Sequence, residues 1–220
     1  MNTRELVNYL QGISENNNRA WFVMNQPSYD ILRAEFIQLV ADVIAETAKF
    51  DPKVKGQDAK KALFRINRDI RFTKDKSPYK SHFSAVIAPG GKKDPGSHYY
   101  FHLDHAGKLL VAGGCYLPPP DVLAKIRRAI AAEPAKFAKL LKHKTLWAHY
   151  GQFADEGRLT RPPKGYTADT PHIEHIKQKS FIVWTEVSAK GMDAAKVKAR
   201  IIEGFRLSLP LVWWLREVVK

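Results

Sequence analysis

The sequence predicts an α+β fold: one domain over residues 1–220, in which N- and C-terminal helices cover an antiparallel or mixed sheet of about five strands. Two periodicities predict this fold. Towards both ends of the chain, apolar residues recur at three- and four-residue steps, as they do in amphipathic helices. Residues 63–72 and 98–103 instead alternate between apolar and polar side chains, as strands do. With 220 residues and 45% hydrophobic content, the chain can bury a substantial core.

At the N-terminal end, helix-capping residues precede the first expected helices. Thr3 can cap a short helix that ends near Ile13. The run Asn16-Asn17-Asn18 favours a turn followed by a second helix, because asparagine side chains bond to nearby backbone groups. The clearest helical pattern spans residues 28–50, and the lysine-rich residues 53–61 are expected to form an exposed loop.

The sheet is expected to draw its strands from residues 63–116 and 181–187, as the segments 63–72, 82–88, 98–103, 108–116 and 181–187. In the first segment Arg68 falls on the apolar face. Its guanidinium must therefore be paired, reach a polar pocket, or be displaced by a bulge or turn. Gly113-Gly114 in a later strand indicates a bulge or the close approach of another backbone.

The C-terminal half is expected to alternate between helices and irregular segments. Helices are predicted over residues 121–132, 134–141 and 193–207, the first of them capped by Asp121. Residues 143–170 show no regular period and are expected to be irregular. Pro210 is expected to kink or restart the last helix, because proline lacks the N–H that a helix needs.

The positive charge of the chain is concentrated in two zones. The formal net charge is +14, and residues 53–93 hold twelve Lys/Arg against three Asp, a net charge of +9. Residues 121–164 carry a net charge of +6, whereas the first 52 residues carry −3. A zoned positive field attracts phosphates, nucleic acid or acidic partners, although a solvated basic surface explains the second zone equally well.

Cysteine content and apolar runs favour a cytoplasmic protein without a membrane partner. Cys115 is the single cysteine, which excludes an internal disulfide and suits a reducing compartment. The N-terminus lacks the apolar run of a signal peptide. The longest apolar run, residues 207–215, is too short to span a bilayer and contains Ser208 and Pro210.

The densest charge cluster lies in residues 65–80, where six cations and two carboxylates occupy sixteen positions. Cations at that density repel one another, so an anion or paired carboxylates must lie among them. We interpret the stretch as the floor of a site for an anionic, phosphate-bearing ligand. The candidate ligand-binding residues are Arg65, Asn67, Arg68, Arg71, Lys76, Tyr79 and Lys80, with Lys164 on a separate loop.

Three functions are compatible with this stretch. The first is a binding module for a nucleotide or a nucleic-acid backbone, in which Tyr79 offers a ring face. The second is an enzyme for a small anionic substrate, with Asp69 or Asp75 as general base. The third is an interaction protein that docks on an acidic partner. Alternatively, Asp69 and Asp75 pair with neighbouring cations in a purely structural network, which can coexist with a ligand site.

Other motifs add little chemistry. His172 and His175 could meet on a helical turn, but no third ligand is evident, so no metal site is predicted. Cys115 is expected to be a packed thiol. The match of residues 77–80 to Ser-x-x-Lys lacks the accompanying elements of acyl-enzyme hydrolases. No Walker loop, dinucleotide fingerprint, His-Glu-x-x-His or Gly-x-Ser-x-Gly element occurs, and the sequence identifies no cofactor.

Four motifs resemble one known family. They are Asn17-Asn18-x-x-Trp21-Phe22, the whole 65–80 stretch, Gly113-Gly114 before Tyr116-x-Pro118, and Pro163-Lys164-Gly165-Tyr166. Together they are similar to a bacterial and fungal family of conserved hypothetical proteins, the domain of unknown function 2461. The resemblance spans nearly the whole chain and implies one α+β domain, but it supplies no mechanism.

Overall fold

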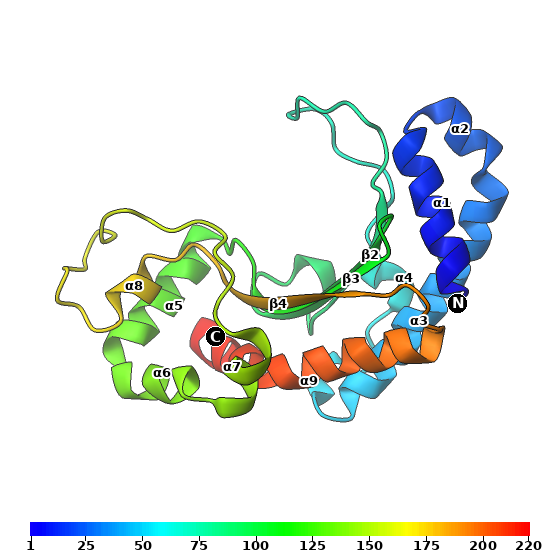
Figure 1. The fold of residues 1–220 in the computed structure, drawn as a ribbon. Coiled ribbons are helices and arrows are strands. Elements are labelled where there is room, and N and C mark those ends of the chain that lie inside the picture. The colour runs from blue at the N-terminus through cyan, green and yellow to red at the C-terminus, as the bar shows by residue number, and fades with distance from the viewer. The chain divides into compact units, whose positions relative to one another are not determined.

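The computed structural model describes residues 1–220 and confirms the α+β fold (Figure 1). The chain divides into two compact units. Unit one comprises Met1–Lys92, Tyr100–Val111 and Glu186–Glu203, and unit two comprises Lys93–Tyr99, Ala112–Thr185 and Gly204–Lys220. The chain passes from one unit to the other within strands and within the last helix. The sequence therefore contains no linker that marks the division.

Four antiparallel strands form the sheet in the order β1-β2-β3-β4. They are β1 (His82–Ile87), β2 (His98–Asp104), β3 (Lys108–Cys115) and β4 (Phe181–Ser188). The expected hairpin of β2 and β3 is confirmed, and β2 alternates as predicted. Its buried side chains are Tyr99, Phe101 and Leu103, and its partly exposed ones are His98, Tyr100, His102 and Asp104.

In unit one, helices α1 (Thr3–Glu15), α2 (Arg19–Met24) and α3 (Gln26–Ala48) precede the sheet, followed by η1 (Pro52–Val54) and α4 (Ala59–Ala62). Asn2, not Thr3, caps α1 by accepting the Glu5 N–H, and Asn18 caps α2 as the asparagine run predicts. The core forms where the ring of Phe36 in α3 contacts those of Phe83 and Phe101, at centroid distances of 5.4 and 5.6 Å.

Unit two contains η2 in part (Gly91–Lys93), α5 (Pro120–Ala132), α6 (Pro134–Leu141), α7 (Lys144–Tyr150) and α8 (Ile173–Ile176), together with the end of α9 (Ala194–Val219). Asp121 lies in the first turn of α5, not at its cap. Helix α7 was not predicted; His143 caps it by accepting the Leu146 N–H. Pro210 does not interrupt α9, because buried Leu211, Val212 and Leu215 hold the following turns in the core.

The close approach predicted at Gly113-Gly114 is confirmed in unit two. A Cβ on Gly113 would lie 2.2 Å from the Ser208 hydroxyl oxygen, and one on Gly114 would lie 2.2 Å from the Phe181 carbonyl oxygen. Gly114 also has a φ of +133°, which side chains disfavour. The neighbouring Cys115 is the expected packed thiol, and burial raises its pKa to about 12.

The strand expected over residues 63–72 does not form, and the sheet therefore has four strands. This segment makes only the isolated bridges Leu63↔Ala85 and Asn67↔Tyr79. Residues 65–80 instead double back on themselves, since the Arg68 N–H bonds to the Pro78 carbonyl and the Lys80 N–H to that of Ile66. We call residues 65–80 the arm; it is the blue-green loop that extends from unit one in Figure 1.

No helix in the chain has both the length and the apolar character required to cross a bilayer.

Candidate functional site

The arm is anchored at its C-terminal end by a side chain from the turn between α1 and α2. The amide of Asn17 donates to the Tyr79 carbonyl at 2.9 Å and accepts the Tyr79 N–H at 3.0 Å. The buried Tyr79 ring stacks on Phe22, with 4.2 Å between ring centroids. Tyr79, predicted to offer its ring to a ligand, therefore has one face covered by Phe22 and fixes the arm to the helices.

Within the arm, Arg68 and Asp75 form an ion pair that joins its two sides. The Arg68 guanidinium also donates to the Ser77 carbonyl at 3.2 Å, so this cation is paired, which is one of the outcomes expected for it from the sequence. Asp75 accepts the Ser77 N–H at 2.9 Å and the Ser77 hydroxyl at 2.6 Å. The Ser77 bonds, followed by Arg68, lower the pKa of Asp75 to about 2.

Asp69 is held by its neighbour Arg71 through two guanidinium bonds of 2.9 and 2.7 Å. These bonds lower the pKa of Asp69 below its ordinary value. Both arm carboxylates are therefore ionised and engaged at neutral pH. A general base works best with a pKa near the working pH, so this geometry does not favour Asp69 or Asp75 in that role.

The other four cations of the arm have no carboxylate within ion-pair distance. Lys76 donates to the Ile70 carbonyl at 2.9 Å, and Lys80 to the Arg65 carbonyl at 3.0 Å, which leaves their charges uncompensated. Arg65 and Lys74 complete this set. With two of six cations neutralised by Asp69 and Asp75, the arm carries a net charge of +4.

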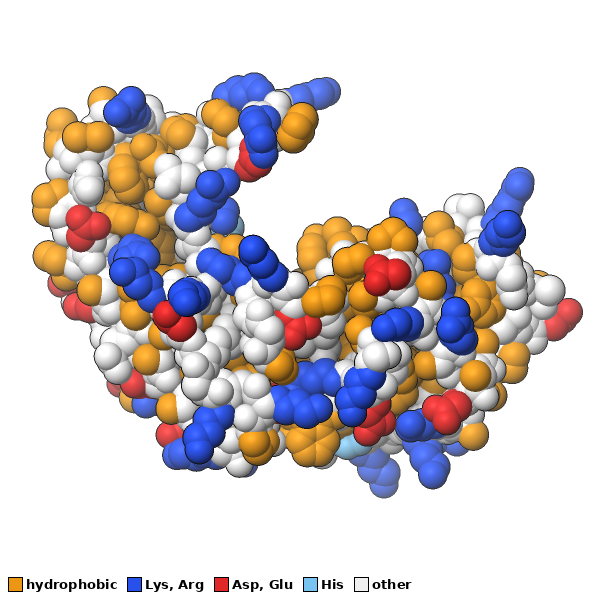
Figure 2. All heavy atoms as spheres, turned by 180° about the vertical axis from the view of Figure 1, so that it is seen from behind, with side chains coloured by type: hydrophobic (Ala, Val, Ile, Leu, Met, Phe, Trp, Pro, Cys, Tyr) orange, Lys and Arg blue, Asp and Glu red, His pale blue; other side chains and the backbone are white.

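The tip of the arm presents an aromatic ring to solvent. Phe72 is 93% exposed, and its ring lies 5.4 Å from the guanidinium carbon of Arg71. Figure 2 shows Lys and Arg side chains gathered around a hydrophobic one at the end of the arm. Phe72 is more exposed than any other large hydrophobic side chain of the protein. Burying a phenylalanine side chain is favourable by about 1.5–3 kcal/mol, so a ligand that covers this ring would gain that free energy.

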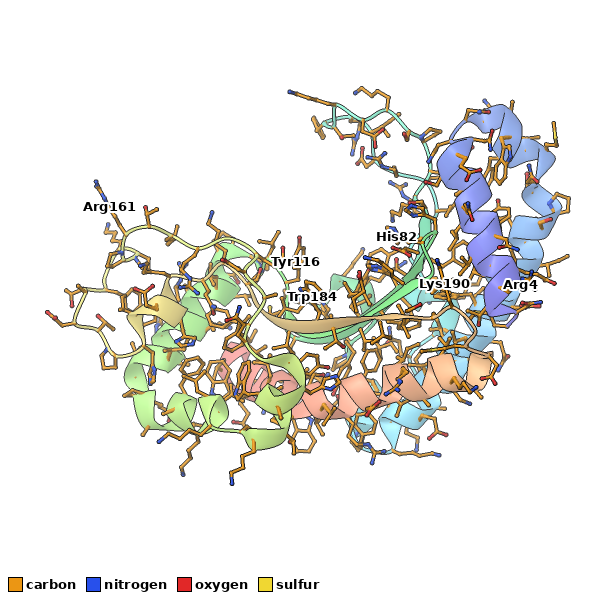
Figure 3. The ribbon with its side chains drawn as sticks, viewed as in Figure 1. Arg4, His82, Tyr116, Arg161, Trp184 and Lys190 are labelled. Atoms are coloured by element: carbon orange, nitrogen blue, oxygen red, sulfur yellow. The ribbon has the colours of Figure 1, made fainter.

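At the base of the arm, one face of β1 and β2 carries the partly exposed side chains of His82, Tyr100 and His102. The rings of His82, labelled in Figure 3, and His102 lie 5.2 Å apart, and the Tyr100 hydroxyl lies 3.2 Å from His102 Nδ1. Burial, followed by His102 and Lys80, lowers the pKa of His82 to about 4, and burial also lowers the pKa of His102. Both imidazoles are therefore neutral at neutral pH.

Two lysines meet at the ring of Phe64, which precedes the arm and lies beside this face. The ammonium groups of Lys80 and Lys92 lie 5.2 and 5.7 Å from the centroid of the Phe64 ring, and Tyr100 contacts its edge. Lys92 also donates to the Leu63 carbonyl at 2.6 Å. Burial, followed by the charges of Arg65 and Lys92, lowers the pKa of Lys80.

The structure groups most of the predicted site residues and separates one. Six predicted side chains belong to the arm beyond its anchored end, namely Arg65, Asn67, Arg68, Arg71, Lys76 and Lys80. Lys164 is exposed in a loop of unit two. Sequence reasoning missed Phe64, His82, Tyr100, His102 and Lys92 as parts of this surface. The alternation of β2 placed Tyr100 and His102 on one face, but nothing local indicated that Lys92 returns to Phe64.

Comparisons with known proteins extend over the arm and the sheet. The family model described as "Conserved hypothetical protein (DUF2461)" matches residues 5–214. Among solved structures, the crystal structure of an uncharacterized protein from Methanothermobacter thermautotrophicus is similar, with 16% sequence identity and a TM-score of 0.37. That similarity covers 79% of this chain and 99% of the other. No curated protein matches the chain.

Proposed function

This chain belongs to the DUF2461 family of conserved hypothetical proteins, and we propose that its arm binds a phosphate-bearing ligand, the backbone of a single-stranded nucleic acid. The observation that carries the proposal is Phe72, an almost fully exposed ring at the tip of an arm with a net charge of +4. Proteins that bind single strands combine these two elements, because cations follow the phosphates while aromatic rings stack on unpaired bases.

The charges of the arm divide into two groups with different roles. The pairs Arg68–Asp75 and Arg71–Asp69 keep the arm in its folded-back form without a ligand. Lys74 and Lys76 flank the tip without a carboxylate partner and supply point charges for phosphates, and Arg65 and Lys80 do the same at the base. An arm formed in advance loses less conformational entropy when it binds.

The two ion pairs that were predicted as an alternative to a ligand site therefore hold the proposed site in its folded-back form. A structural network alone would balance its charges, whereas the arm keeps four cations in excess of its acids. The excess exposed charge destabilises the free arm by self-repulsion, and bound phosphates would relieve that repulsion.

The proposal is tested by fluorescence anisotropy with a labelled single-stranded oligonucleotide of about 16 nucleotides. We expect log K to fall linearly with log salt between about 50 and 200 mM, with a slope of roughly −3 if four cations each neutralise one phosphate. The duplex of the same sequence should bind more weakly, because its bases are not available to Phe72.

The same assay distinguishes an acidic protein partner. Polyglutamate offers carboxylates without bases, so it should compete less well than an oligonucleotide of equal charge. Equal competition, together with equal binding of duplex and single strand, would show that the arm recognises charge alone. That outcome would overturn the proposal and support docking on an acidic partner.

A further inference from the structure

Two lysines without acid partners meet at the base of the arm, and the charge of a third cation, Arg65, acts on one of them, Lys80. The ammonium groups of Lys80 and Lys92 lie within 6 Å of the Phe64 ring centroid, at 5.2 and 5.7 Å. They donate to the carbonyls of Arg65 and Leu63, two positions apart on the same extended segment. Backbone carbonyls thus hold both ammonium groups at one place, although their charges repel each other.

The neighbouring carboxylates are already engaged elsewhere. Asp69 is bound through both oxygens by Arg71, and these bonds, ahead of the charge of Arg65, lower its pKa. Beside His82 and His102, Asp104 accepts the backbone N–H groups of Ala106 and Lys108, and Glu186 pairs with the Lys108 side chain at 2.7 Å. The three cations therefore lack an internal counter-ion.

We propose that Arg65, Lys80 and Lys92 form a binding site for a phosphomonoester group, such as that of a nucleoside monophosphate or of a nucleic-acid end. A phosphomonoester carries about −1.5 to −2 charge at pH 7 and three strong acceptor oxygens. A phosphodiester inside a nucleic-acid chain carries one charge per phosphate. Three uncompensated cations therefore match a phosphomonoester better than a diester.

The groups beside the cations suit the organic part of such a ligand. Neutral His82 and His102, with the Tyr100 hydroxyl, offer hydrogen-bond donors and acceptors without adding charge. Burial, followed by the charges of His102 and Lys80, lowers the pKa of His82, so the field of the proposed site acts on this imidazole. A bound dianion would offset that field and raise the pKa of His82.

This inference rests on the proposed function and deepens it, since it assigns a ligand class to the base of the same arm. Binding at the base does not depend on Phe72 at the tip. The first experiment is isothermal titration calorimetry with AMP, adenosine and the methyl ester of AMP, which is a diester. AMP should bind, the diester should bind at least about tenfold more weakly, and adenosine should give no measurable heat.

Variants locate the site. Lys92→Ala and Lys80→Ala should each lower AMP affinity about tenfold, whereas Lys196→Ala, an equal charge change at an exposed position of α9, should leave it unchanged. Lys92 is exposed, so its removal should not disturb folding, and circular dichroism checks this. Equal AMP affinity in Lys92→Ala and the unsubstituted protein would overturn the inference, as would equal binding of AMP and its methyl ester.

A second readout follows the His82 ring by NMR. The pKa of His82 should rise when AMP is bound and should also rise in Lys80→Ala, because both changes reduce the positive field. Comparing 5′-phosphorylated and 5′-hydroxyl oligonucleotides then separates a free nucleotide from a nucleic-acid end. If AMP binds while oligonucleotides do not, the proposed function fails and this inference stands. If AMP does not bind and oligonucleotides bind equally with and without a 5′-phosphate, this inference fails and the proposed function stands.

Discussion

The side-chain amide of Asn17 makes a pair of hydrogen bonds with the backbone N–H and C=O of Tyr79, 62 positions away in the sequence. An asparagine in a turn between two helices thereby acts as a short strand partner for the end of the arm. The arrangement matters because Tyr79 is buried and its backbone groups depend on this partner.

We predict that Asn17→Ala destabilises the protein by about 1–3 kcal/mol, since it leaves a buried N–H and C=O without partners. Urea unfolding followed by circular dichroism measures this loss. Asn8→Ala, at an exposed position of α1, should change the free energy of unfolding by no more than about 0.5 kcal/mol. Equal effects of the two substitutions would show that the Asn17 bonds do not hold the arm.

Phe72→Ala should weaken oligonucleotide binding about tenfold, because one stacked base contributes about 1–3 kcal/mol. Its stability should stay within about 0.5 kcal/mol, because the ring is 93% exposed. Anisotropy titrations measure the affinity, with Met24→Ala, 79% exposed on α2, as the matched control. An unchanged affinity would remove the observation on which the proposed function depends.

The double substitution Lys74→Ala/Lys76→Ala should make the salt dependence of oligonucleotide binding shallower by about 1–2 in log K against log salt. The reason is that each cation that contacts a phosphate releases counterions on binding. The matched control is Lys139→Ala/Lys142→Ala, an equal loss of charge in and after α6. If both doubles lower the slope equally, net charge alone drives the interaction.

Asp75 should make the fold of the arm sensitive to acid. Its pKa is lowered from 3.8 to about 2 in the folded protein, so its stabilising effect is complete above pH 3.8 and is lost as the pH falls towards 2. NMR signals of the Arg68 and Lys80 amides, both bonded within the arm, should shift over that window. Asp75→Asn should show the shifted signals already at pH 7, and Asp30→Asn should not.

His82 should add a second pH dependence at higher pH. Burial lowers its pKa from 6.5 to about 4, so the unfolded chain takes up the proton first and stability falls as the pH drops from 6.5 to 4. The groups that face it are His102, Lys80, Asp104 and His105, and of these only Asp104 opposes the shift.

The contribution of His82 is the difference between the unsubstituted protein and His82→Gln. Urea unfolding at several pH values should show a slope that is shallower in the variant by up to about 1.4 kcal/mol per pH unit in this window. Parallel curves for the two proteins would show that the imidazole is not buried in its neutral form.

The sequence predicted most elements because their signals are local. The alternation in β2 and the three-residue asparagine run depend only on neighbouring positions, and both predictions were confirmed. Gly113-Gly114 was also predicted correctly, since a glycine pair inside a strand has few other uses. Helix α7 was missed because its cap, His143, is not among the common capping residues.

The arm was mispredicted as a strand because its alternation is real but its partners are not local. Backbone hydrogen bonds within the arm, such as the one between Arg68 and Pro78, compete with hydrogen bonds to the sheet, and tertiary contacts decide which set forms. Lys92 was missed for the same reason, because only the fold brings it to Phe64. The cluster of cations itself was identified from the sequence, because charged residues can be counted without knowledge of the fold.

Three lysines of this region donate to backbone carbonyls, at Leu63, Arg65 and Ile70. An extended segment with unbonded carbonyls is a template on which a second chain can add a strand and aggregate. Here the three lysine ammonium groups already donate to those carbonyls, and their positive charges would repel the same segment of a second copy. The arm can therefore project from the molecule without becoming a point of self-assembly, and removing these lysines would remove that protection.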